Sequence, residues 1–137
     1  MDIAIILGLL VALFYGVGTF FAKIVCEKNP LFQWIVVNVV GIILCLIILI
    51  KYKNIIITEQ KILGYAIISA ILVVIGSLIL YYALYKGKAS IVVPLSSIGP
   101  AITVALSILF LKETLTTYQM IGIALIIVGI ILLSISN

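Results

Sequence analysis

The residues of this sequence that could do chemistry include two serines and a proline inside an apolar segment that runs from Ser90 to Leu111. Pro100 has no backbone N–H, and its ring crowds the carbonyl group four residues earlier, that of Ser96. A helix in a membrane must satisfy its own backbone hydrogen bonds, so this carbonyl is expected to be an open acceptor beside the hydroxyls of Ser96 and Ser97. Such a polar site inside a membrane could begin a pathway for a solute. A packing kink covered by a neighbouring helix explains the same residues equally well.

Two further sets of polar side chains recur at helical spacing. Tyr15, Thr19 and Lys23 are four residues apart and share one helix face. If that face borders a cavity, it offers a ring, a hydroxyl and an ammonium group at successive depths. Ser77, Tyr81 and Tyr85 form a second stripe at the same spacing. Tyrosines near a helix end usually form an aromatic belt, yet a stripe that runs inward to a serine also fits a cavity wall. The sequence alone does not decide between these two interpretations.

The composition places these stripes in a membrane. The chain has 137 residues, of which 66% are hydrophobic and 9% charged, and its mean hydropathy is +1.54. Soluble domains are about 45–50% apolar. The apolar runs are each near the length of about 20 residues that a helix needs to cross the hydrocarbon layer, and they lack the alternation of barrel strands. We therefore expect an all-α, multi-pass protein of the cell membrane.

Several classes of function are excluded by the same composition. The formal net charge is +4, but every basic residue is a lysine at or near the end of an apolar run, as in interface anchors, so no nucleic-acid partner is expected. The sequence has no histidine and only four acidic residues. We therefore expect neither an acid–base enzyme nor a metal site or cofactor. Cys26 and Cys45 show no pairing or metal-ligand pattern and are interpreted as packing residues.

Five transmembrane helices in one domain, residues 1–137, account for the apolar runs. Their ends are marked by capping residues. Asn29 followed by Pro30 is a typical helix start, and Thr116 with Gln119 fits a capping box. Asp2, Thr58 and Ser90 are candidate N-caps of the first, third and fourth helices. The expected helices cover about residues 2–26, 30–50, 59–85, 90–111 and 117–134.

Small residues mark the surfaces on which helices are expected to pack. A stripe of small residues lets another backbone approach closely, and it indicates helix packing more often than ligand contact. The residues assigned to packing are Gly8, Ala12 and Gly16 in the first helix and Gly122 and Gly129 in the fifth.

The second helix contains two polar-capable side chains, Trp34 and Asn38. Trp34 is interpreted as an interfacial anchor, and Asn38, one turn deeper, as a donor or acceptor to a neighbouring helix. Both interpretations are structural rather than functional.

The lysines leave the orientation of the chain undetermined. With five spans, one side of the membrane carries Lys51, Lys53, Lys61 and Lys112, and the other carries Lys23, Lys28, Lys86 and Lys88. Orientation follows a bias in lysine and arginine, and here the tally is four against four. A chain without that bias can insert both ways round and pair as an antiparallel dimer. Counts this small are also often uninformative.

The C-terminal half of the sequence resembles a known family. The segment from Tyr82 to Gly129 contains Y-A-L, the double-proline helix S-I-V-V-P-L-S-S-I-G-P and the run F-L-K-E-T-L-T-T-Y-Q-M-I-G-I-A-L-I-I-V-G. It is similar to the EamA-like family of the drug/metabolite transporter superfamily. The first helix agrees, because Tyr15-Gly16 stands where the family usually has Trp-Gly and Lys23 follows at the family's spacing.

The resemblance implies an architecture and a pathway. Most members have ten helices in two five-helix repeats of opposite orientation, so this chain resembles one repeat and would need a second copy or a sister subunit to enclose a central site. In such relatives the first, third and fourth helices line the cavity. Carried over, and with Thr19 added from its stripe, the expected substrate-pathway residues are Tyr15, Thr19, Lys23, Ser77, Tyr81, Ser96, Ser97 and Pro100.

The resemblance also has a departure that bears on the substrate. Related small multidrug-resistance proteins exchange protons for cationic drugs at a glutamate inside the first helix, and this sequence has no acidic residue in mid-membrane. Neutral, zwitterionic or anionic solutes are therefore favoured over cations. The expected function is a half-size transporter of small organic metabolites that acts as a dimer by alternating access. A subunit of a lipid-linked sugar flippase and a non-transporting membrane assembly protein are the alternatives.

Overall fold

The computed structural model describes residues 3–51 and 60–135. Five of its helical segments are long and apolar enough to cross a membrane. They begin and end close to the expected positions, so the all-α fold with five spans is confirmed. The candidate N-caps Asp2 and Thr58 lie outside the described residues.

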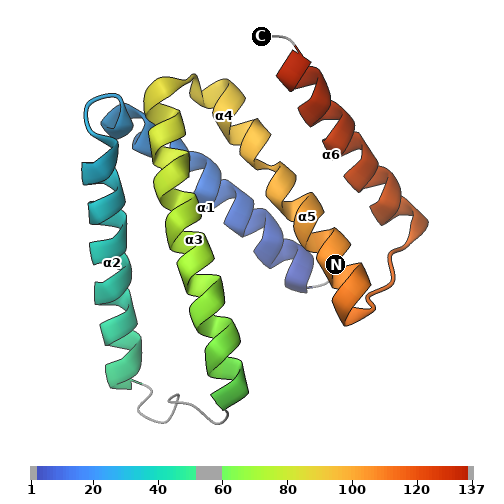
Figure 1. Ribbon diagram of the computed structural model, residues 1–137, viewed down its shortest axis with the longest axis horizontal. Helices are drawn as coiled ribbons and strands as arrows, with labels where there is room; N and C mark the ends of the chain where they lie inside the picture. Colours follow the sequence, from blue (N-terminus) through green and yellow to red (C-terminus); the bar gives the residue numbers. More distant parts are fainter. Residues whose placement is uncertain (1–2, 52–59, 136–137) are drawn as a thin grey trace. The chain divides into compact units, whose positions relative to one another are not determined.

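The helices fall into two compact units, each of which is described by itself. The first unit contains α1 (Ile3–Cys26), α2 (Pro30–Lys51) and α3 (Gln60–Lys86). Each of these helices packs against the other two; in Figure 1 they are drawn in blue, teal and green. The second unit contains the remaining elements, and in it α4 and α5 both pack against α6. Their bounds are α4 (Ala89–Ser96), α5 (Ile98–Leu106), the π-helical turn η1 (Ser107–Leu111) and α6 (Thr117–Ile135).

Two of the capping predictions are confirmed. The Asn29 Oδ1 atom accepts a hydrogen bond of 3.0 Å from the backbone N–H of Phe32, and α2 begins at Pro30. At the start of α6, the Gln119 Oε1 atom accepts from the backbone N–H of Thr116 at 2.8 Å, and the Thr116 hydroxyl oxygen accepts from the backbone N–H of Gln119 at 3.4 Å. Both starts follow from local side-chain chemistry, which is why the sequence alone identifies them.

The third predicted cap is wrong, because Ser90 lies inside α4 rather than at its start. The N-cap position is Lys88, which has an extended backbone with φ −72° and ψ 132° and makes no side-chain cap hydrogen bond. The carbonyl oxygen of Lys88 instead accepts from the backbone N–H groups of Ile91 and Val92, both at 3.0 Å. The backbone alone therefore begins this helix, without a serine cap.

The fourth span, expected as one helix over residues 90–111, is interrupted at Ser97. The chain leaves α4 at Ser96 and starts α5 at Ile98, so Pro100 becomes the third residue of a new helix. The first backbone N–H groups of a helix have no partner within it, and a proline there removes a donor that had no carbonyl to bond. The break thus accommodates Pro100 more simply than the expected kink.

The hydroxyls at the break bond to the chain itself. Ser96 donates to the carbonyl oxygen of Val93 at 2.7 Å and Ser97 donates to the same oxygen at 3.2 Å. The backbone N–H of Ser97 bonds to the Pro94 carbonyl at 3.0 Å, three residues back, as in a tightened last turn. The segment is therefore a discontinuous membrane span.

Among residues 3–51 and 60–135, the small residues assigned to helix packing face open space. A Cβ atom added at Gly8, Gly16, Gly122 or Gly129 would meet no other heavy atom within 4 Å, and Ala12 is exposed. The stripe on α1 is thus available to another helix, and its packing role stays a prediction.

Candidate functional site

A cavity of about 540 Å³ lies between α1, α2 and α3 within the first unit. Tyr15 and Thr19 of α1 line it, and so do Ser77 and Tyr81 of α3. The two stripes that the sequence presented separately therefore border the same space. A volume of this size is within the range of about 300–1,000 Å³ that is usual for small-molecule sites.

The third wall of the cavity is α2, a helix that was not expected to contribute pathway residues. Gln33 and Asn38 line the cavity from this side. Asn38 was expected to hydrogen-bond to a neighbouring helix and not to line a cavity. An amide deep within an apolar helix is the signal in the sequence that points to a cavity-lining position. The other lining residues are Phe14, Gly18, Ala22, Val37, Val73, Val74 and Leu80.

Trp34 connects the second and third walls. Its indole N–H lies 3.1 Å from the Ser77 hydroxyl oxygen and 3.3 Å from the carbonyl oxygen of Val74. Ser77 in turn donates to the Val74 carbonyl at 2.8 Å. A half-buried indole in an apolar bundle needs a partner for its N–H, and α3 provides one. Trp34 therefore bonds α2 to α3, and its role as an interfacial anchor stays a prediction.

The remaining polar groups of the walls bond mostly to the chain itself. Asn38 Nδ2 donates to the Trp34 carbonyl of its own helix at 2.8 Å, and not to a neighbouring helix as expected. The Thr19 hydroxyl lies 2.8 Å from the Tyr15 carbonyl oxygen and 3.0 Å from that of Gly16. Gln33 of α2 and Tyr81 of α3 line the same cavity. The polar atoms are thus held in place before any solute arrives.

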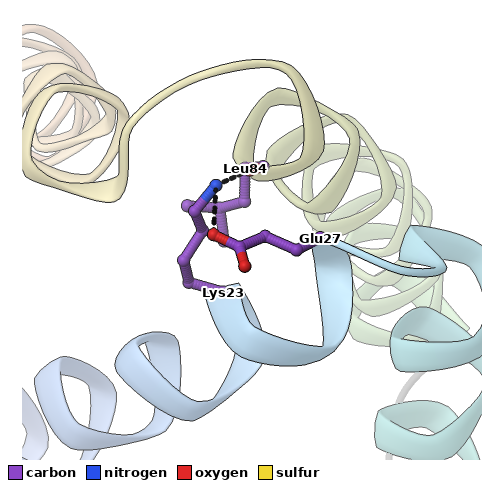
Figure 2. A network of polar contacts seen from close by, with 3 residues as sticks. All are labelled: Lys23, Glu27 and Leu84. Carbon is purple, nitrogen blue, oxygen red and sulfur yellow. Dashed lines mark hydrogen bonds and ion pairs between the residues drawn. The ribbon is translucent and has the colours of Figure 1, made fainter.

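Lys23 joins the ends of α1 and α3. It is not among the residues that line this cavity, and its part in a pathway stays a prediction. Its ammonium nitrogen lies 2.8 Å from the carbonyl oxygen of Leu84 and 3.3 Å from the Glu27 Oε1 atom. Both contacts are drawn as dashed lines in Figure 2. Leu84 is fully buried and lies two residues before the end of α3. The last carbonyls of a helix have no amide partner within it and carry partial negative charge. Lys23 therefore caps the C-terminus of α3, while Glu27 balances its charge.

The other tyrosines of α3 are separated from the cavity. Tyr82 and Tyr85 are exposed, and the Lys86 ammonium lies 5.7 Å and 5.0 Å from the centres of their rings. A lysine beside two tyrosines at a helix end is typical of the membrane–water interface. Of the tyrosines in α3, Tyr81 is the one that lines the cavity.

Ser96, Ser97 and Pro100, the other expected pathway residues, belong to the second unit. All three are exposed, and their part in a pathway stays a prediction. Within that unit, α5, η1 and α6 border a smaller, wholly apolar cleft of about 280 Å³. No group of three metal-ligating side chains occurs in residues 3–51 or 60–135.

Comparison with known proteins agrees with this picture. A profile of the EamA-like transporter family matches residues 2–135. A protein of Methanocaldococcus jannaschii that bears the name "Uncharacterized protein" is 91% identical over 137 residues, and the alignment covers all of both chains. No solved structure matches the chain.

Proposed function

The chain belongs to the EamA-like transporter family and is a multi-pass membrane protein, and on this premise we propose that it moves small organic metabolites as a half-size, dimeric transporter. The observation that carries the proposal is the cavity of about 540 Å³ walled by α1, α2 and α3. It places hydroxyl and amide groups along helices that are otherwise apolar, and polar groups at such depth usually mark a solute pathway. Tyr15, Thr19, Ser77 and Tyr81 are the proposed contacts with the solute.

The proposal includes a second subunit, either another copy in the opposite orientation or a sister chain. Two features support it. The stripe of Gly8 and Gly16 on α1 has no neighbour within 4 Å of an added Cβ atom, so another backbone can approach there. The span from Ala89 to Leu111 is discontinuous at Ser97, and broken helices at the interface of inverted repeats recur in transporters that work by alternating access.

Flux through the purified protein in liposomes tests the proposal. We expect uptake of at least one labelled compound from a panel of amino acids, sugars and nucleosides. Tyr81→Phe removes a hydroxyl from the cavity wall and, at the free energy of a single hydrogen bond to the solute, should lower the initial rate by about three- to tenfold. Tyr118→Phe in α6 is the matched control, because Tyr118 is 88% exposed and lies outside the cavity. No flux for any compound would exclude the proposed function.

Reporter fusions at Asn137, read on both sides of the membrane, test the orientation of the subunits. Signals from both sides would support the antiparallel homodimer, and a signal from one side would exclude it. Crosslinking in native membranes then distinguishes a self-pair from a heteromer, which is the arrangement expected of a flippase subunit for lipid-linked sugars.

A further inference from the structure

The cavity between α1, α2 and α3 has no charged lining among the described residues. Its walls carry one amide each from Gln33 and Asn38, the hydroxyls of serine, threonine and tyrosine, and otherwise apolar groups. An ion that enters such a space gives up its hydration shell, and only opposite charge or several hydrogen bonds replace that shell. The charge state of the solute is therefore restricted by the walls.

Lys23 and Glu27, which follow the lining residue Ala22 along the chain, are already paired with each other. The Lys23 ammonium contacts the Leu84 carbonyl at 2.8 Å and Glu27 at 3.3 Å, and Figure 2 shows the three groups converging at the ends of α1 and α3. An anion that recruited Lys23 would have to compete with both of these partners. Lys23 is also not among the residues that line the cavity.

The hydrogen-bonding groups of the walls are largely used as well. The hydroxyl protons of Thr19 and Ser77 point to backbone carbonyls of their own helices, and Ser77 also accepts from Trp34. Asn38 donates to its own helix. The cavity can satisfy a few polar atoms of a solute, but it cannot surround an ammonium or a carboxylate group.

From these observations we infer that the cavity selects uncharged solutes with an apolar, preferably flat body, and discriminates against ions of either sign and against zwitterions. The flat body matches the rings of Phe14, Tyr15 and Tyr81, which line the space from two helices. The inference rests on the proposed function, since it names the solute class of the same site. It narrows the class expected from the sequence, which still included anions and zwitterions.

Equilibrium binding to the purified, full-length protein tests the inference without any flux. Trp34 is the single tryptophan of the chain, and its indole N–H bonds to Ser77 in the cavity wall, so its fluorescence should report an occupied cavity. Benzyl alcohol, benzoate and benzylammonium are probes of similar size that differ in charge. We expect benzyl alcohol to bind at least about tenfold more tightly than either ion. Equal or tighter binding of an ion, or no binding of all three, would overturn the inference.

A charge introduced into the wall should reverse the preference. Gln33→Glu keeps the shape of the side chain and places a carboxylate in the cavity wall, so it should make benzylammonium the tightest of the three probes. Gln119→Glu is the matched control, because Gln119 caps α6 and glutamate serves equally in a capping box; it should bind as the wild type does. An unchanged order of affinities in a folded Gln33→Glu variant would contradict the inference. If that variant does not fold, the wild-type probe series still decides.

The two proposals fail in different ways. Selective binding of benzyl alcohol without flux of any compound would refute the transport proposal and leave the solute class standing. Flux together with preferred binding of an ion would refute the solute class alone.

Discussion

The contact of Lys23 with the end of α3 makes a sharp prediction about local stability. Lys23→Met keeps most of the apolar stem and removes the ammonium group that bonds to the Leu84 carbonyl at 2.8 Å. Because Leu84 is fully buried, its carbonyl oxygen would lose this donor in a place that water does not reach freely. Glu27 would lose its ion-pair partner, but 61% of its side chain is exposed, so water can replace the lysine.

These two losses differ in size. A hydrogen bond to a charged group contributes about 1.5–3 kcal/mol, and an exposed ion pair contributes about 0–1 kcal/mol. We expect Lys23→Met to lower the free energy of opening the α1–α3 contact by about 2 kcal/mol, and Glu27→Gln to lower it by less than about 1 kcal/mol. At about 1.4 kcal/mol for each factor of ten, the first change raises the open population about thirtyfold and the second by at most about fivefold.

Thiol labelling of Cys26 measures this opening directly. Cys26 is fully buried at the end of α1, so a thiol reagent reacts with it only when the contact opens. A Cys45→Ser background removes the exposed cysteine. Lys28→Met, an exposed lysine near the same helix end, is the control and should leave the rate unchanged. If Lys23→Met labelled no faster than Lys28→Met, or if Glu27→Gln had the larger effect, the capping role assigned to Lys23 would be wrong.

Two further predictions concern the helices that wall the cavity. Asn29→Ala removes the oxygen that accepts from the Phe32 N–H and should destabilise the protein by about 1 kcal/mol. Reversible unfolding in mixed micelles measures this loss. Lys28→Ala is the control, and an equal loss of stability in that variant would contradict the capping role of Asn29. Trp34→Phe removes the indole donor to α3 and should lower the free energy of unfolding by about 1 kcal/mol. The comparison is Trp34→Tyr, whose hydroxyl supplies a donor. If the Phe and Tyr variants were equally stable, the bond to α3 would contribute nothing measurable.

The fold could be predicted from the sequence because it rests on local properties. Apolar runs of spanning length predict the five helices, and these are present. Asn29 and the Thr116–Gln119 box predict helix starts because the bonding atoms lie within three residues of one another. Such short-range chemistry is visible in the order of the residues.

The site was only half predictable, because its contacts join residues far apart in the chain. Helical spacing identified the faces of Tyr15 and Ser77, but not that they border one cavity with Asn38. The Lys23–Leu84 bond spans 61 positions, and a carbonyl acceptor leaves no signal in residue type. The break at Ser97 was missed for a related reason: a proline predicts a disturbed helix, and whether the helix bends or restarts depends on the surrounding backbone.

The central claim is that the solute passes through the cavity between α1, α2 and α3, and filling that cavity tests it most directly. Gly18 lines the cavity, and an added Cβ atom there meets nothing within 4 Å, so Gly18→Leu should fill the space without disturbing the helices. Gly41→Leu in α2 is the matched control, since Gly41 is equally unhindered and does not line the cavity. We predict that Gly18→Leu lowers the initial flux in liposomes at least about tenfold while Gly41→Leu retains it. Equal flux through the two variants would show that the solute takes another route.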